Sequence, residues 1–325
     1  MSDENRIPSR KDLLDIASLS VEEIEHLLKI AVPFKDLFKR SVKKVPALRG
    51  KTVLNLFYEP STRTSSSFEV AASRLSADVT NFTVSLSSVV KGESIIDTID
   101  TLQAMRTDYV VIRHSAAGIP NLIAKHTRAS VVNAGDGFHA HPTQALLDMF
   151  TIREVFPESA GRKVLIVGDI LHSRVARSTS TILNKLGVEV GVLGPSTLVP
   201  AARHGFMRGF KDWDEAFAWK PDIVYLLRVQ LERQGEPFFP SLGEYHRVYG
   251  LTTKRYQRVK DEGIYLMHPG PVNRGVEIDN EAMTYERSLI NTQVENGIAA
   301  RMAVLYWLKP DTGSEARGGA GAKES

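Results

Sequence analysis

One short run of side chains is suited to binding an anion: Ser61-Thr62-Arg63-Thr64. It follows a β-branched segment at 53–57 and precedes apolar residues at helical spacing, so we expect it at the N-terminus of a helix. Free N–H groups and the helix dipole favour an anion there, and Arg63 adds a planar fork that matches phosphate. The simpler reading is an ordinary Ser/Thr cap with a chance arginine, because such caps occur on most helices. Other residues must decide between the two.

Further polar residues in the first half of the chain fall at comparable places. Arg113 closes a predicted strand, at the edge of an open α/β sheet where ligands bind. His141 and Gln144 open the next long helix in the sequence His-Pro-Thr-Gln, again at an N-terminus. Ser87 and Lys91 lie in a polar loop, where a solvated lysine is the ordinary interpretation. Together these residues favour an anion site over a simple helix cap.

Two arginines follow predicted strands in the second half. Arg174 comes shortly after a strand at 163–168, and Arg228 ends a strand at 222–228, with Gln230 two residues on. Each arginine can form a bidentate pair with a carboxylate, although surface salt-bridge arginines are common elsewhere in the chain. Their position at the carboxyl ends of strands favours a ligand. NAD binding is disfavoured because the G-x-G-x-x-G fingerprint is absent.

The elements that must position these residues alternate along the chain as strand and helix. We predict strands at 53–57, 79–84, 109–113, 130–133, 163–168, 188–193, 222–228 and 264–267. The helical signals are capping-box spacings at Ser20/Glu23 and Ser66/Glu69, a helix starting at Pro142, another stopped by Gly187, and a long pattern at 288–308. This alternation predicts an α/β fold with two doubly wound parallel-sheet domains joined by interdomain helices.

The motifs resemble a known family. Ser-Thr-Arg-Thr, Val-Ile-Arg-His and His-Pro-Thr-Gln, in this order and spacing, are similar to the carbamoyl-phosphate half of the aspartate and ornithine carbamoyltransferases, and the resemblance covers about residues 10–308. It implies a carbamoyl-phosphate site at Ser61, Thr62, Arg63, Thr64, Ser87, Arg113, His141, Gln144, Gly270 and Pro271. Residues with expected catalytic roles are Arg63, Thr64, Lys91, Arg113 and His141.

The same resemblance gives these side chains their tasks. Thr64, Arg113 and His141 are expected to face the carbonyl oxygen, where attack on the carbamoyl carbon places negative charge. Gln144 is expected to contact the carbamoyl amine. The resemblance assigns carbamoyl phosphate to a domain of residues 1–145 plus the helix at 291–309, and the acceptor to a domain at 146–290. The tail at 310–325, rich in Gly, Ala, Ser and charge, is predicted to be disordered.

The second half indicates aspartate as the acceptor. The resemblance implies that Lys91, Arg174, Arg228 and Gln230 bind L-aspartate, with the two arginines on its two carboxylates. Ornithine enzymes typically carry Asp-x-x-x-Ser-Met-Gly and His-Cys-Leu-Pro, and neither is present. The corresponding segment here is His-Pro-Gly-Pro, and its Gly270 replaces the leucine of the well-known form. Glycine is expected to make this loop freer.

The expected reaction gives N-carbamoyl-L-aspartate and phosphate, an early step of pyrimidine synthesis. In the family the loop that matches Ser87 and Lys91 reaches into a neighbouring subunit, which implies a homotrimer with shared active sites. Regulatory chains or a dihydroorotase-like partner are left open. Two rival hypotheses are transfer to ornithine or another amino acid, and a non-catalytic homologue. A non-catalytic homologue would be free to lose Lys91 or His141, and the presence of both residues disfavours that hypothesis.

Composition excludes several other classes. The 325 residues contain no cysteine, so no disulfide framework, thiolate zinc site or cysteine nucleophile is expected. The net charge is only +3 without a basic block, so we expect no nucleic-acid partner. The polar N-terminus is no signal peptide, and no apolar run approaches the roughly 18 residues of a membrane span. We therefore expect a cytoplasmic protein with no membrane contact.

Other chemistry is also disfavoured. His139 and His141 form an H-x-H pair without a third ligand at sensible spacing, so neither a metal nor another cofactor is expected. A hydrolase triad of Ser61, His141 and Asp148 is disfavoured because the G-x-S-x-G elbow is missing. The three tryptophans lie on helical patterns and are expected to pack in the core: Trp213, Trp219 and Trp307.

Overall fold

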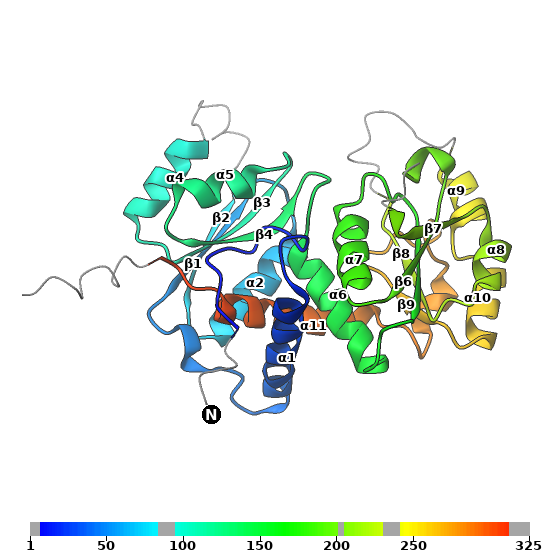
Figure 1. Ribbon diagram of the computed structural model, residues 1–325, viewed down its shortest axis with the longest axis horizontal. Coiled ribbons are helices and arrows are strands. Elements are labelled where there is room, and N and C mark those ends of the chain that lie inside the picture. Colours follow the sequence, from blue (N-terminus) through cyan, green and yellow to red (C-terminus); the bar gives the residue numbers. More distant parts are fainter. Residues whose placement is uncertain (1–6, 84–94, 201–204, 230–240, 312–325) are drawn as a thin grey trace, which may run out of the picture.

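Two parallel β-sheets, each with its own helices, lie side by side in the computed structural model (Figure 1). The structure describes residues 7–83, 95–200, 205–229 and 241–311. Every pair of neighbouring strands in both sheets is parallel. The predicted fold class, two doubly wound α/β domains, is confirmed.

The first sheet has four strands in the order β2-β1-β3-β4. Its elements are β1 (Thr52–Phe57), α2 (Thr62–Arg74), β2 (Asp78–Thr83), α4 (Ile95–Ala104), β3 (Tyr109–His114), α5 (Ile119–His126) and β4 (Ser130–Asp136). Alternate strand residues are buried on opposite faces. Val53 and Val111 join the large core with α2, whereas Leu54 and Val110 pack with Ile123 of α5. Burial on both faces explains why these strands read as continuous apolar runs.

The second sheet has five strands in the order β7-β6-β5-β8-β9. Its elements are β5 (Lys163–Val167), α7 (Arg174–Lys185), β6 (Glu189–Leu193), β7 (Met207–Phe210), α8 (Trp213–Ala218), β8 (Ile223–Leu226), α9 (Leu242–Tyr249), α10 (Thr253–Asp261) and β9 (Tyr265–Met267). All eight predicted strands are present. The edge strand β7 was not predicted, because Arg208 and Gly209 break its short apolar pattern.

Ligand-binding geometry follows from the strand orders. The chain winds outward in opposite directions from β1 and β3 in one sheet and from β5 and β8 in the other. At such switch points the loops that leave the carboxyl ends of neighbouring strands separate and open a crevice. Ser61–Thr64 follow β1, Arg113 lies near the end of β3, and Arg174 and Arg228 follow β5 and β8.

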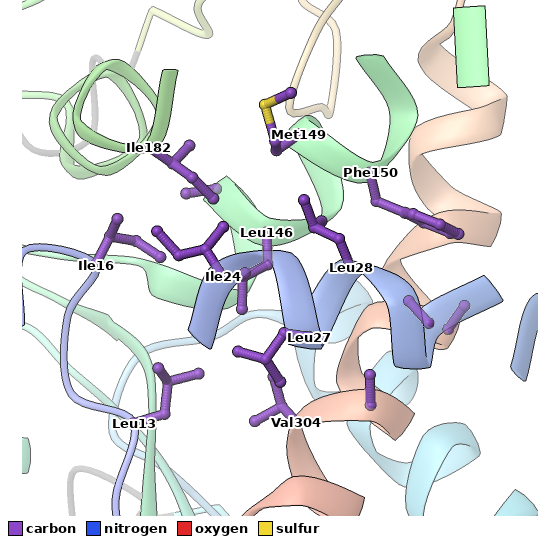
Figure 2. Close-up of a cluster of buried hydrophobic side chains, with 14 of the residues drawn as sticks. Leu13, Ile16, Ile24, Leu27, Leu28, Leu146, Met149, Phe150, Ile182 and Val304 are labelled. Carbon is purple, nitrogen blue, oxygen red and sulfur yellow. The ribbon is translucent and has the colours of Figure 1, made fainter. Parts of the chain in front are cut away.

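Three helices pack together where the two lobes, the first and the second sheet with their helices, meet: α1 (Val21–Asp36), α6 (Pro142–Val155) and α11 (Ile290–Trp307). Figure 2 shows Ile24, Leu27 and Leu28 of α1 beside Leu146 of α6 and Val304 of α11. Helix α11 packs on α1, α2 and α6, so the C-terminal pattern does return to the first domain. Helix α6 is buried almost all round, as a central helix must be.

The first residues of α1 and α2 differ from each other in how they cap their helices. The capping box at Ser20 and Glu23 is confirmed, since both reciprocal hydrogen bonds are present. The box at Ser66 and Glu69 is wrong: α2 already begins at Thr62, so Ser66 lies inside the helix. The first turn of α2 lacks apolar residues because it borders a cleft rather than the core. Short 3-10 helices complete the chain at Leu37–Lys39, Pro46–Leu48, Ser196–Leu198 and Asn280–Thr284.

The three tryptophans belong to the interior of the protein. Trp213, Trp219 and Trp307 are all buried, as predicted. In the part of the chain that the structure describes, no helix is both long enough and apolar enough to cross a membrane.

Candidate active site

A cleft of about 570 Å³ lies where the strand ends of both lobes meet. It gathers these residues predicted from the sequence: Ser61, Thr62, Arg63, Thr64, Arg113, His141, Gln144, Arg174, Arg228, Gly270 and Pro271. They come from segments up to about two hundred positions apart, so the fold assembles one site from both halves. Ser87, Lys91 and Gln230 lie outside the described residues.

The first turn of α2 forms one wall of the cleft. Ser61 is the N-cap residue, yet its side chain makes no capping hydrogen bond. Its hydroxyl and the unpaired N–H groups of this turn can therefore serve an anion. Thr64 follows one position after Arg63 and is buried at the base of the turn. This geometry disfavours the interpretation of the run as an ordinary cap.

Arg63 and Gly270 contact each other across the cleft. Gly270 has φ +64°, and a Cβ at this position would overlap the Arg63 guanidinium. Its N–H donates to His268 Nδ1 at 2.8 Å, which holds the loop after β9. Burial, and then the positive charge of Arg228, lower the pKa of Arg63. Glycine thus gives Arg63 its place beside a second arginine.

His268 is a neutral support for this loop. Burial, followed by the charges of Arg63 and Arg228, lowers the pKa of His268 to about 3. Its Nδ1 accepts from Gly270, so its single ring proton is on Nε2. Its backbone N–H donates to Gln293 Oε1 of α11 at 3.0 Å. The loop is therefore fixed to the helix that joins the two lobes.

Glu59 links the two halves of the cleft, and the sequence reasoning missed it. Its Oε2 accepts from Arg113 Nε at 3.1 Å and from Arg174 Nη2 at 3.0 Å. Arg113 is the second-to-last residue of β3 in the first sheet, whereas Arg174 begins α7 beside the second. Both arginines are more than nine-tenths buried, where a carboxylate orients guanidinium groups strongly. An acidic residue just before an anion-binding turn was the available signal.

A second missed carboxylate, Glu277, supports the Arg228 segment. It accepts from the backbone N–H groups of Val229 and Asn273, each at 2.7 Å. The Asn273 side chain also donates to Glu277 at 2.8 Å and to the Val229 carbonyl at 3.1 Å. Glu277 is 1% exposed. It ties the segment after β8 to the loop after β9.

Asp148 and His139 have structural partners. Asp148 accepts hydrogen bonds from Gln144, Gln293, Thr179 and Tyr225. These four donors occupy both of its carboxylate oxygens. His139 Nδ1 lies 3.0 Å from Asp136 in the loop between β4 and α6, as expected for a loop residue.

The charge of the cleft is strongly positive. Among the described residues that line it, the cationic ones are Arg63, Arg113, Arg174, Arg228 and Arg301. The one acidic lining residue of that set is Asp169. Burial, the largest effect, lowers the pKa of Arg301 to about 10, so it stays charged at neutral pH. Such a cleft suits a phosphate together with further anionic groups.

The fold and this site define a class of protein, a two-domain carbamoyltransferase. Residues 11–154 match the family model "Aspartate/ornithine carbamoyltransferase, carbamoyl-P binding domain". Residues 160–308 match the model "Aspartate/ornithine carbamoyltransferase, Asp/Orn binding domain". The chain belongs to the aspartate/ornithine carbamoyltransferase family.

The individual proteins that are similar to this chain include aspartate carbamoyltransferases. The chain is 69% identical over 303 residues to the aspartate carbamoyltransferase catalytic subunit of Akkermansia muciniphila, covering 93% of this chain and 98% of that protein. The solved aspartate transcarbamoylase of Trypanosoma cruzi in complex with carbamoyl phosphate and aspartate aligns with TM-score 0.83 and 26% identity, over 93% and 97% of the two chains. The catalytic subunit of M. jannaschii aspartate transcarbamoylase aligns with TM-score 0.79 and 33% identity, over 94% of this chain and 99% of that chain.

Proposed function

We propose that this chain is an aspartate carbamoyltransferase, which transfers the carbamoyl group of carbamoyl phosphate to the amine of L-aspartate in pyrimidine synthesis. The observation that carries the proposal is the single cleft that joins the Ser61–Thr64 turn to Arg174 and Arg228. An anion site for phosphate and two arginines for two carboxylates match the two substrates. The names of the similar proteins support the same reaction.

Carbamoyl phosphate occupies the first-sheet side of the cleft. Its phosphate binds at the N-terminus of α2, where Ser61, Thr62 and Arg63 offer hydroxyl, N–H and guanidinium donors. Thr64, Arg113 and His141 donate to the carbonyl oxygen. Gln144 and the carbonyls of the loop at Gly270 and Pro271 accept from the carbamoyl amine.

L-Aspartate occupies the second-sheet side. Arg174 and Arg228 bind its two carboxylates, and Gln230 and Lys91 are expected to complete the site. Glu59 supports this arrangement, because its contacts with Arg113 and Arg174 connect the two substrate sites. Ornithine fits poorly, since its side-chain amine would face a cleft lined by arginines.

The reaction needs position and charge more than a dedicated base. The aspartate amine attacks the carbamoyl carbon, and negative charge develops on the carbonyl oxygen. Donors held at that oxygen typically contribute about 3–4 kcal/mol each to the barrier. The bond between the carbon and the phosphate oxygen then breaks, and the leaving phosphate takes the amine proton. His268, held neutral, is suited to support rather than to proton transfer.

The domain assignment follows from these roles. Residues 1–145 with the helix at 291–309 bind carbamoyl phosphate, and residues 146–290 bind aspartate. Of the tail predicted at 310–325, residues 312–325 lie outside the described residues. The packing of α11 on α1, α2 and α6 supports the placement of the C-terminal helix with the first domain. The protein is proposed to act in the cytoplasm.

The direct test is phosphate release from carbamoyl phosphate by the purified protein with a panel of amino-acid acceptors. Release should depend on L-aspartate. Equal release with L-ornithine would contradict the assignment. Arg63→Ala should abolish turnover, and an active variant would remove Arg63 from the site.

The proposed homotrimer with Ser87 and Lys91 in a shared site has its own test. Arg63→Ala and Lys91→Gln chains are each expected to be inactive, and mixing them should restore part of the activity. No recovery on mixing would contradict the sharing of sites between subunits. Co-purification from the native source would reveal regulatory chains or a dihydroorotase-like partner, which the "catalytic subunit" name of the relatives makes worth testing.

A further inference from the structure

A fully buried carboxylate lies beneath the cleft, on α6 one turn after Gln144. Asp148 is 0% exposed and accepts four side-chain hydrogen bonds. Its Oδ1 accepts from Gln144 Nε2 at 3.0 Å and from Gln293 Nε2 at 2.8 Å. Its Oδ2 accepts from the hydroxyls of Thr179 and Tyr225, both at 2.8 Å. These donors come from α6, α11, α7 and β8, so both lobes hold the carboxylate in place.

This carboxylate fixes which end of the Gln144 side chain faces it. An ionised carboxylate only accepts hydrogen bonds, so the amide NH₂ of Gln144 must point toward Asp148. The amide oxygen Oε1 is then directed away. In the described part of the chain Oε1 accepts no hydrogen bond. It is also not one of the fully buried atoms that lack a partner, so it is accessible from the cleft. Since Gln144 lines the cleft, the cleft meets an acceptor at this point.

We propose that Asp148 is a positioning residue that holds the Gln144 amide with its oxygen toward the cleft, and thereby selects an acyl phosphate that carries an amine. The inference rests on the proposed function, because it deepens the recognition of the carbamoyl group. An acyl phosphate with a methyl group in place of the amine has the same shape but cannot donate. It would leave Oε1 without a partner in a confined site, which costs affinity.

An amide at position 148 cannot replace this arrangement. The Asp148→Asn side chain has one acceptor oxygen where the native one has two, yet four donors converge on it. If its oxygen serves Thr179 and Tyr225, its NH₂ meets the NH₂ of Gln144. Gln144 is then driven to turn over, which presents N–H donors to the cleft in place of Oε1. Gln293 is less free to turn because its Oε1 accepts from the backbone N–H of His268.

The test compares two ligands of nearly equal shape, carbamoyl phosphate and acetyl phosphate, by calorimetric titration. The readout is the ratio of their dissociation constants, which a merely structural role for Asp148 would leave unchanged. The wild-type protein should prefer carbamoyl phosphate, and Asp148→Asn should reduce that preference by about tenfold or more, as expected for one lost hydrogen bond. Thr179→Val, which removes a donor from Oδ2 without touching Gln144, is the matched control and should keep the wild-type ratio.

A reciprocal variant covers the case in which Asp148→Asn does not fold. In Asp148→Asn/Gln144→Glu the amide and the carboxylate exchange places, so the residue at 148 donates and an oxygen again faces the cleft. The double variant should recover the preference for carbamoyl phosphate. A folded Asp148→Asn with the wild-type ratio, or a folded double variant without any preference, would overturn the proposal. A wild-type protein that fails to carbamoylate aspartate would instead contradict the proposed function.

Discussion

Replacing Gly270 with alanine tests how the loop after β9 makes room for Arg63. Two effects are expected. Gly270 has φ +64°, and a side chain in this left-handed conformation costs about 1–2 kcal/mol. The new Cβ would also overlap the Arg63 guanidinium, so the arginine must move from its place at the start of α2. Loss of one charge-assisted bond to phosphate corresponds to about 1.5–3 kcal/mol, or a roughly 10- to 100-fold weaker affinity.

Gly275 offers a matched control in the same loop. Its φ is +75°, and a Cβ there would have no atom within 4 Å. Gly275→Ala should therefore lose about the same stability in urea unfolding as the backbone part of Gly270→Ala, and keep its affinity for carbamoyl phosphate. Calorimetric titration of both variants with carbamoyl phosphate separates the two effects. Equal, wild-type affinity in both would refute the contact between position 270 and a phosphate-binding Arg63.

Two further predictions follow from the charges of the site. Glu59→Gln removes the carboxylate that orients Arg113 and Arg174. Steady-state kinetics should give a kcat/KM for aspartate at least about tenfold lower than that of the wild type. An unchanged value would show that Glu59 does not couple the two substrate sites. The pKa of His268 is about 3 in the folded protein, against an ordinary value of 6.5, so the unfolded chain takes up this proton at a higher pH. The free energy of unfolding should therefore fall as the pH drops below about 6.5, by up to about 4 kcal/mol near pH 3. His268→Asn, whose side-chain oxygen can still accept from Gly270, should flatten this dependence in urea unfolding at several pH values; a slope equal to the wild type would contradict the neutral histidine.

The sheets could be predicted because their strands are buried on both faces. Val53 and Leu54, for example, pack into different cores on the two sides of β1, which leaves a continuous apolar run in the sequence. Strand β7 lies at an edge, and its Arg208 is exposed, so it carries no such run. The false capping box at Ser66 arose because the three-residue spacing of Ser66 and Glu69 does not show that the helix already begins at Thr62, beside the cleft.

The residues that line the cleft could be named from their motifs, whereas the supporting residues could not. Ser61–Thr64, Arg113 and His141 fall at strand ends and helix starts, where position alone suggests a ligand. Glu59, Glu277 and Asp148 act through contacts with residues far away in the sequence, such as the bond from Glu59 to Arg174. The position of Glu59 just before the anion-binding turn was a local signal, but only the folded arrangement reveals which residues these carboxylates contact.

The proposed enzyme transfers a carbamoyl group to aspartate rather than to another amine. The most direct measurement is a competition in one vessel, in which the purified protein receives carbamoyl phosphate with equal amounts of L-aspartate and L-ornithine, and mass spectrometry identifies the products. We expect N-carbamoyl-L-aspartate in large excess. Carbamoylated ornithine as the main product, or no carbamoylated amino acid beyond the level of a protein-free control, would contradict it.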